Sequence, residues 1–536
     1  MMTDRYTPRL CLALACCLLG ELARAAEFQW AVDMEGKDRR AYLWIPPKCE
    51  RVRGVILTVQ NLLEKPMVED PVFRSAAADA GFAIVWINPA GFEDKSPLAG
   101  EFKYRDGAGR TLDKLLADLA AESGYAEIAT APLMPMGHSA AGPLSWQVAY
   151  WRPDRVIACV AIKTTFPGPP GWDPQANIEG VPLVYVTGQC TEWPEASRNR
   201  ERHWHGVRDA MVKMRERSDR HLMSVVVEPG GGHFEWSPAM ARYIGLYIRK
   251  AAKYRIGADG ELRLLRLEDG WLTDTSMLEP SRFAPAAYSA YRGAKTQAFW
   301  HFDEEEARAA EAFCGDRNPR ELQMVTFMED GRPINGAKQG FAPMRFAPAD
   351  DGVTFHVEGG FLSEVPEQLI NAGTKLGHAP GPVRIRMITG SAIQTAANTL
   401  RVKFDREGFT SRACTLWMLA EHDGDDVYRK NVQPGRIMLP TCNSQGKPQT
   451  LTFAPIADVK PGTKTIPLKA ESDSGLPVDF YVISGPAEAD GPRLKFSDIP
   501  PRARLPMKVR VVAYQWGLPG RIQSADPVER VFEIEK

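Results

Sequence analysis

The stretch that decides the fold of this 536-residue chain reads Leu133-Met134-Pro135-Met136-Gly137-His138-Ser139-Ala140-Ala141-Gly142. Its first four residues predict a short buried strand, and a helix-forming segment follows the last glycine. Ser139 therefore stands at a sharp strand-to-helix turn, where the residues two before and two after it must be small. Gly137 and Ala141 meet that requirement, and Gly142 leaves further room for close packing.

The turn around this serine predicts a nucleophile with an oxyanion site beside it. The N-terminus of the following helix directs N–H groups and a positive dipole end toward a developing negative charge, so the Ala140 N–H is the expected first donor. The second donor is expected in the loop after the predicted strand Gly54–Gln60, at the backbone N–H of Asn61 or Leu62. Glu64, further along this loop, is interpreted as a charge at a helix N-terminus.

A base for the serine is expected after the last core strand, Met223–Glu228. The glycine-rich residues 229–234 follow, where the backbone can turn sharply and deliver His233 above the sheet edge. His233 is therefore the predicted catalytic base. No Lys-Ser or Lys-Thr pair follows the glycines, which argues against a phosphate-binding loop.

A carboxylate that orients the base is expected in the loop after the predicted strand Val181–Thr187. Glu192 lies in that loop and is the predicted acid of a Ser-His-Glu triad, with Glu195 as the nearest alternative. Glu235, two residues after the histidine, is interpreted as an exposed charge.

Two tryptophans, Trp172 and Trp193, flank the expected mouth of the site. They are candidates for stacking on a sugar or an aromatic acyl group, and plain loop packing is the alternative. His203 and His205 are two residues apart on a predicted helix, so their side chains diverge in direction, and no third metal ligand is evident. The sequence therefore predicts neither a metal site nor a cofactor.

Around the serine turn, residues 27–256 alternate between short β-branched runs and helical stretches. The apolar runs are nearly continuous, as expected for strands that helices cover on both faces. Repeated strand–helix units predict an α/β fold with a doubly wound, mostly parallel sheet. The predicted strands are the three named above and Arg40–Ile45, Phe82–Ile87, Leu133–Met136 and Val156–Lys163, and the predicted helices are Pro71–Ala80, Thr111–Glu122, Ala140–Tyr150, Arg200–Arg217 and Ala239–Lys253.

The chain after residue 256 has a different pattern. Residues 257–332 form a transitional region with a short hairpin at Leu262–Leu272 and an acidic helix at Asp303–Phe313. Beyond it Gly, Pro and Asn become frequent and helical periodicity fades, which predicts two β-sandwich domains at residues 333–450 and 451–536. The strand-like runs are Val353–Val357, Val383–Ile388, Leu400–Phe404, Cys414–Leu419, Thr450–Phe453, Pro477–Ile483 and Met507–Tyr514.

The N-terminus predicts export. Arg5 and Arg9 precede an apolar run over residues 10–19, and Ala23-Arg24-Ala25 provides the small residues of a cleavage site. Residues 1–25 are therefore expected to be a secretory signal peptide ahead of a catalytic domain at 26–256, with the mature protein periplasmic or secreted. Lipoprotein processing at Cys16 is a poorer match to the pattern. No other segment is long and apolar enough to predict a membrane span.

The net charge bears on the binding partners to be expected, and the cysteines bear on disulfide pairing. A formal net charge of −1 gives no reason to expect nucleic acid or an anionic membrane surface. The six cysteines after the signal are scattered, and most are interpreted as buried free thiols, although pairing stays open in an oxidising compartment. They are Cys49, Cys159, Cys190, Cys314, Cys414 and Cys442.

The motifs Gly137-His138-Ser139-Ala140-Ala141, Glu192 and Gly232-His233 follow one another in the order nucleophile, acid and histidine. With them, residues 27–256 resemble the α/β-hydrolase superfamily, and within it exported bacterial esterases related to polyester depolymerases and feruloyl or acetylxylan esterases. The lipase-like His-Gly-Gly-Gly oxyanion motif is absent. Residues 451–536 resemble a bacterial Ig-like module, on the segments Ile466–Ser472, Ser474–Val478 and Ser484–Ala487.

The residues and the resemblance together imply a serine hydrolase that cleaves carboxylic esters through an acyl-enzyme. An ester of acylated polysaccharide is the expected substrate class, because export and β-modules suit an insoluble substrate. Two alternatives stay open: a serine peptidase on the same fold, and a carbohydrate-binding or adhesion protein whose hydrolase domain is inactive.

Overall fold

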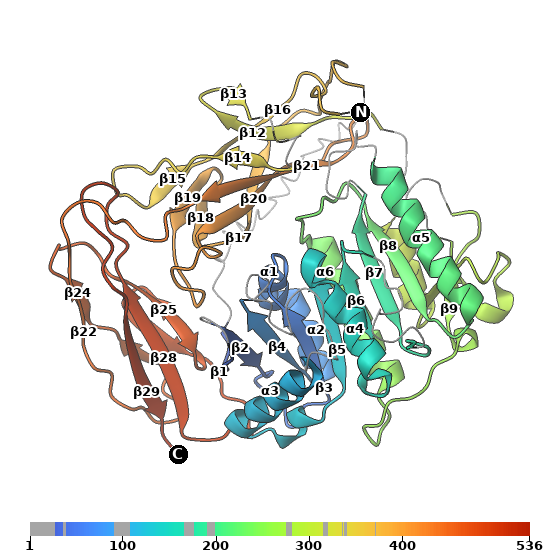
Figure 1. The fold of residues 1–536 in the computed structure, drawn as a ribbon, viewed down its shortest axis with the longest axis horizontal. Helices are drawn as coiled ribbons and strands as arrows, with labels where there is room; N and C mark the ends of the chain where they lie inside the picture. The colour runs from blue at the N-terminus through green and yellow to red at the C-terminus, as the bar shows by residue number, and fades with distance from the viewer. Residues whose placement is uncertain are drawn as a thin grey trace, which may run out of the picture.

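The computed structural model describes residues 27–35, 39–89, 108–165, 176–189, 199–274, 281–314, 320–334, 336, 340–369 and 371–536. The predicted signal peptide lies outside these residues, so export stays a prediction. Figure 1 shows the mixed α/β part of the chain beside two regions built of β-strands.

An eight-stranded sheet forms the centre of the α/β part. Its order is β1-β2-β4-β3-β5-β6-β7-β8, antiparallel where β2 pairs with β1 and β4 and parallel from β4 onward. Every residue of β3 to β8 is buried, which explains their nearly continuous apolar sequences. The predicted doubly wound, mostly parallel sheet is confirmed. The strands are Trp30–Asp33, Arg40–Trp44, Gly54–Val59, Phe82–Asn88, Leu133–His138, Cys159–Ile162, Leu183–Gly188 and Met223–Glu228.

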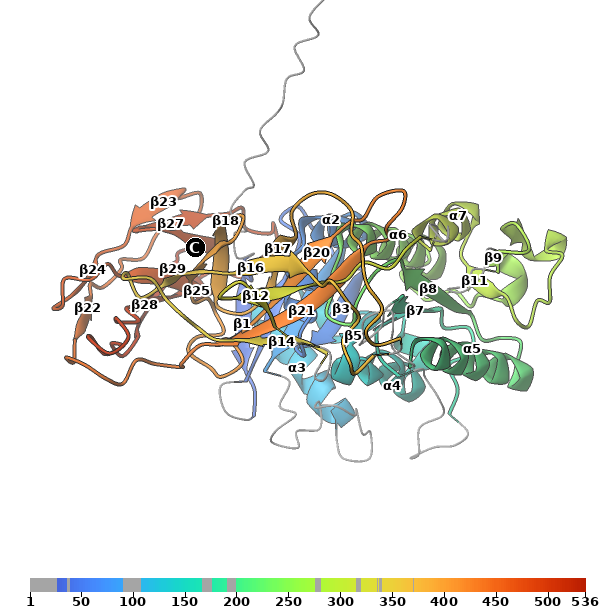
Figure 2. The same cartoon turned by 90° about the horizontal axis from the view of Figure 1, so that it is seen from above.

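Helices cover both faces of the sheet, with α2 and α6 on one face and α3, α4 and α5 on the other (Figure 2). Local chemistry sets their ends: Asp70 caps α2 by accepting the N–H groups of Val72 and Phe73, and Gly81 ends it at a φ of 69°. The five predicted helices are present; the sequence did not predict β1, and of the short helix α1 it indicated only the N-terminus, at Glu64. The helices are α1 Glu64–Glu69, α2 Pro71–Ala80, α3 Ala108–Ser123, α4 Pro143–Trp151, α5 Asn199–Arg217 and α6 Pro238–Arg255.

The region after α6 packs beside β8 through the strand β11 (Phe299–His301). The predicted acidic helix is present as α7, Glu304–Phe313, and Asp303 caps it through the Glu306 N–H. The predicted hairpin at 262–272 is wrong. β9 (Trp271–Thr273) pairs instead with β11 and with β10 (Ala286–Ala287), because the partner segments come later in the chain.

The central β region, defined here as β12 to β21, has a hydrophobic core around Phe327, Phe355, Phe404 and Leu416, and Tyr514 and Trp516 from the C-terminal part of the chain join it. Its largest sheet has the order β14-β21-β20-β17, and β14 pairs parallel to β21, although the strands of a β-sandwich are usually antiparallel. The strands are Val325–Glu329, Arg332–Pro333, Ala342–Met344, Thr354–His356, Glu358–Phe361, Arg384–Thr389, Ala392–Ala396, Thr399–Val402, Thr415–His422 and Asn431–Met438.

The C-terminal β region, β22 to β29, consists of small antiparallel sheets, as expected for a β-sandwich. It lies beside β1, at the opposite end of the main sheet from β8 (Figure 1), and the Gly485 N–H donates to the Phe28 carbonyl at 3.0 Å. Its core joins that of the α/β part. The strands are Leu451–Phe453, Thr465–Pro467, Ala470–Ser472, Asp479–Ser484, Ala487–Asp490, Arg493–Phe496, Met507–Tyr514 and Val528–Ile534.

The cysteine interpretation holds across the described part of the chain. Cys49, Cys159, Cys314 and Cys414 are buried free thiols there, and Cys442 is an exposed one. Among the residues that the structure covers, no helix is long and apolar enough to cross a membrane, and no group of acidic, histidine or cysteine side chains could hold a metal ion.

Candidate active site

Ser139 lies at the turn between β5 and a 3-10 helix, Ser139–Ala141, that leads into α4. Its φ of 52° is in the left-handed region that non-glycine residues seldom adopt. The turn closes only because its neighbours are small. A Cβ on Gly137 would lie 2.2 Å from the Ala141 carbonyl oxygen, and one on Gly142 would lie 2.4 Å from Thr164.

The predicted base reaches the predicted nucleophile. His233 Nε2 lies 3.0 Å from Ser139 Oγ, although the two residues are 94 positions apart in the chain. The histidine loop, defined here as residues 229–237, begins at the end of β8 and ends at the cap of α6. Ser139 is partly exposed and Ala140 is exposed, so solvent can reach the turn.

His138 holds the histidine loop to the serine turn. Its Nε2 lies 2.9 Å from the His233 carbonyl oxygen, and because a carbonyl only accepts, Nε2 carries the proton. Burial, with His233 close by, lowers the pKa of His138 well below its usual value. His138 is therefore a neutral donor at physiological pH and fixes the main chain of the base.

The buried Glu64 carboxylate links the loop after β3 to the serine turn through hydrogen bonds. The sequence did not indicate this role. Glu64 is the first residue of α1, so its predicted position at a helix N-terminus is confirmed. Its side chain, however, is fully buried. Oε2 accepts the Asn61 and Leu62 N–H groups at 2.8 Å each, and Oε1 accepts the His138 N–H at 2.7 Å. Burial raises the pKa of Glu64 to about 7, against these hydrogen bonds, which lower it.

The Glu64 contacts bear directly on the predicted oxyanion donors. The backbone N–H groups of Asn61 and Leu62 point to a carboxylate that a substrate oxygen would have to displace, so the geometry does not favour them. The Asn61 side chain is better placed: its Nδ2 donates to the His138 carbonyl at 3.2 Å, next to the nucleophile. Asn61 is partly exposed, and Arg412 of the central β region binds its carbonyl oxygen.

Glu235 is not an exposed charge, which corrects the sequence interpretation. Its side chain is fully buried, and its carboxylate accepts the Gly232 N–H at 3.3 Å and pairs with Lys430 at 2.7 Å. Burial alone would raise the pKa of Glu235, but Lys430, Lys163 and Arg386 hold it below its usual value. Sequence spacing gave no signal for this, because two of these cations lie more than 150 positions away.

Lys163 anchors the histidine loop from within the α/β part. It follows β6 with a φ of 45°, and its Nζ donates to Glu228 and to the Glu235 carbonyl, each at 2.7 Å. Lys163 and Glu228 are both buried, so each charge needs the other.

Several predicted site residues lie outside the part of the chain that the structure describes. These are the triad acid Glu192, its alternative Glu195, and the candidate substrate contacts Trp172 and Trp193. Their roles stay predictions. His203 and His205 fall in α5, as expected, and nothing is described of their side chains.

Three observations converge on one fold. The sheet is mostly parallel with an antiparallel β2, a strained serine turn joins β5 to a helix, and a histidine from the loop after β8 reaches that serine. The α/β part adopts the α/β-hydrolase fold. Both faces of its sheet carry helices, as this fold requires.

Solved structures that resemble this chain include a poly(3-hydroxybutyrate) depolymerase, LpqC, from Bordetella parapertussis, at 18% identity over 44% of this chain and 92% of that one, with a TM-score of 0.30. An esterase from Pyrobaculum calidifontis matches at 18% identity over 42% and 84%, with a TM-score of 0.29. Poly(aspartic acid) hydrolase-1 from Sphingomonas sp. KT-1 matches at 13% identity over 41% and 98%, with a TM-score of 0.31. No protein-family model and no curated protein matches the sequence.

Proposed function

We propose that the protein is a serine hydrolase that cleaves carboxylic esters through an acyl-enzyme. The observation that carries the proposal is the 3.0 Å contact between Ser139 Oγ and His233 Nε2 at a strained, solvent-accessible turn. Ser139 Oγ attacks the ester carbonyl while its proton passes to His233 Nε2. The alcohol leaves with that proton, and water then releases the acid from Ser139 by the same route.

The negative charge of the tetrahedral intermediate needs donors close to the nucleophile. We assign the first to the Ala140 N–H, at the N-terminal end of the turn that leads into α4. We assign the second to the Asn61 side-chain amide, since its backbone N–H and that of Leu62 bind Glu64.

Glu192 is the proposed third member of the triad. The two buried glutamates near the histidine loop serve elsewhere, because Glu228 pairs with Lys163 and Glu235 pairs with Lys430 and Arg386. The loop after β7 follows Gly188, at the same edge of the sheet as the loop after β8. A carboxylate from that loop would stabilise the imidazolium that forms on His233 during attack.

The proposed setting is export to the periplasm or beyond, with an acylated polysaccharide as substrate. The apolar run and small-residue site at the N-terminus support export, and the two appended β-regions suit an extended or insoluble substrate.

An ester panel tests this function. Wild-type protein and Ser139→Ala are compared on p-nitrophenyl acetate, a feruloyl ester and acetylated xylan, with a peptide anilide as the peptidase substrate. We expect turnover of at least one ester and its loss in Ser139→Ala. Turnover of the anilide alone would replace the esterase assignment with a peptidase, and unchanged turnover in Ser139→Ala would reject the nucleophile.

A further inference from the structure

The three residues after His233 are each held by the central β region. Phe234 stacks on Trp417 of β20, with ring centroids 4.7 Å apart and planes 24° apart. The Glu235 carboxylate pairs with Lys430 at 2.7 Å and with Arg386 of β17 at 3.3 Å. Arg386 also donates a hydrogen bond to the carbonyl oxygen of Trp236, at 3.1 Å.

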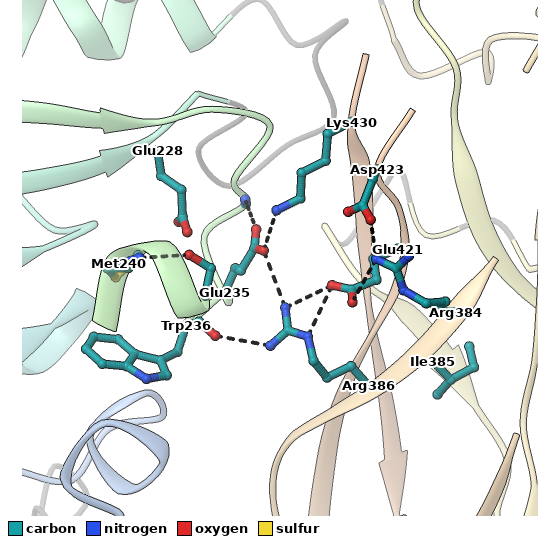
Figure 3. Close-up of polar contacts among 12 residues, drawn as sticks. Glu228, Glu235, Trp236, Met240, Arg384, Ile385, Arg386, Glu421, Asp423 and Lys430 are labelled. Carbon is teal, nitrogen blue, oxygen red and sulfur yellow. Dashed lines mark hydrogen bonds and ion pairs between the residues drawn. The ribbon is translucent and has the colours of Figure 1, made fainter. Parts of the chain in front are cut away.

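Figure 3 shows the polar contacts of Lys430 and Arg386 with Glu235 and Trp236, between the histidine loop and the strands of the central β region. Glu421 Oε2 accepts two hydrogen bonds from the Arg386 guanidinium, at 2.9 and 3.1 Å. The same guanidinium also contacts the histidine loop. The two-point bond to Glu421 makes the Arg386 head a preorganised group rather than a mobile one.

The contacts lie close to the base itself. The Phe234 ring stands edge-on to the His233 ring, with centroids 4.7 Å apart, so Trp417 supports the base through one intervening side chain. Burying the Glu235 carboxylate without cations beside it would destabilise the fold. Two of the cations that pair with it, Lys430 and Arg386, belong to the central β region.

The same region holds the other catalytic loop. Arg412 binds the Asn61 carbonyl, and Lys65 of α1 pairs with Glu407 at 2.9 Å and with Asp405. Both loops that flank Ser139 are therefore tied to residues 386–430, whereas an independent binding module would need only a linker.

We propose that Lys430, Arg386 and Trp417 are positioning residues that hold the histidine loop in its catalytic place, so that the central β region completes the active site. This inference rests on the proposed function. It accounts for the charged and aromatic contacts that the central β region directs at the two catalytic loops.

The test compares Lys430→Met and Trp417→Leu with Lys375→Met in the full chain. Lys375 is the matched control: it is another lysine of the central β region, and its ion-pair partner, Glu364, lies in the same region and on neither catalytic loop. Lys430→Met leaves the buried Glu235 without one of its cations and could impair folding. Trp417→Leu removes no charge, so it tests the inference even if Lys430→Met does not fold.

Two readouts are combined, kcat and KM on p-nitrophenyl acetate and hydrogen exchange in peptides covering residues 229–237. We expect kcat to fall by about tenfold or more with KM within about twofold, because the base is misplaced but the acyl pocket is not. Exchange in the loop should accelerate in both variants, and Lys430→Arg should restore much of the rate. Lys375→Met should match wild type.

Wild-type kcat and wild-type loop exchange in both variants would overturn the inference. Equal losses in Lys375→Met would do so too, because they would reflect general destabilisation of the central β region. A wild-type protein that cleaves no ester rejects the proposed function instead, and the exchange data alone then decide whether the central β region holds the loop.

Discussion

Gly137→Ala is the sharpest perturbation of the serine turn. The added Cβ would lie 2.2 Å from the Ala141 carbonyl oxygen and 3.0 Å from the Gly142 Cα, whereas ordinary contact begins at 3.4 Å. The obstacles are backbone atoms on the far side of the turn, so no rotamer change relieves them. The turn must open by about 1 Å, and a displacement of that size costs about 10²-fold in rate when it separates reacting groups.

The expected result is a fall in kcat/KM of about 10²-fold on p-nitrophenyl acetate, with a loss of about 1–3 kcal/mol in the free energy of unfolding from overpacking. Gly206→Ala is the matched control. Nothing lies within 4 Å of the added Cβ in α5, so alanine there should leave the rate unchanged. Its helix should gain about 0.5–1 kcal/mol.

Activity and urea unfolding are measured on both variants. A Gly137→Ala protein with near-wild-type kcat/KM would show that the turn tolerates a side chain, and the reasoning about the strained serine would then be wrong. A loss in Gly206→Ala as large as that in Gly137→Ala would point to a general effect of the substitution instead.

Three further predictions follow from the contacts around the site. Asp70→Ala removes the cap of α2 and the acceptor of the Trp236 indole N–H. The free energy of unfolding, measured in urea, should fall by about 2 kcal/mol. A loss below about 0.5 kcal/mol would contradict this prediction. Burial raises the pKa of Glu64 to about 7, so this group stabilises the fold below its unfolded pKa and loses that contribution as pH rises through about 7. The thermal advantage of wild type over Glu64→Gln should therefore narrow from about pH 5 to about pH 8, and a constant or widening gap would refute it. His138→Phe removes the donor to the His233 carbonyl and should lower kcat about tenfold with little change in KM, whereas unchanged kcat would remove His138 from the site.

Sequence patterns predicted the main sheet and, at its edge, the pairing of Ser139 with His233. Continuous apolar runs marked the buried strands, and the small residues around Ser139 marked the strained turn. The position of His233 followed from the rule that loops after parallel strands meet at one edge of the sheet. The 3.0 Å contact agrees with that reasoning.

Contacts between distant parts of the chain could not be predicted in the same way. Glu235 looked like a surface charge because its cations, Lys430 and Arg386, lie 195 and 151 positions away. Glu64 looked like a helix-end charge because its acceptor role depends on where the loop after β3 folds back. The hairpin at 262–272 failed for a related reason, since β9 pairs with strands later in the chain.

The central claim is that Ser139 is a nucleophile activated by His233. The most direct measurement is labelling of the full chain with a fluorophosphonate, followed by intact mass and peptide mapping. We expect one adduct per chain, on Ser139, in wild type and none in Ser139→Ala. An unlabelled wild type, or an adduct that persists in Ser139→Ala, would contradict it.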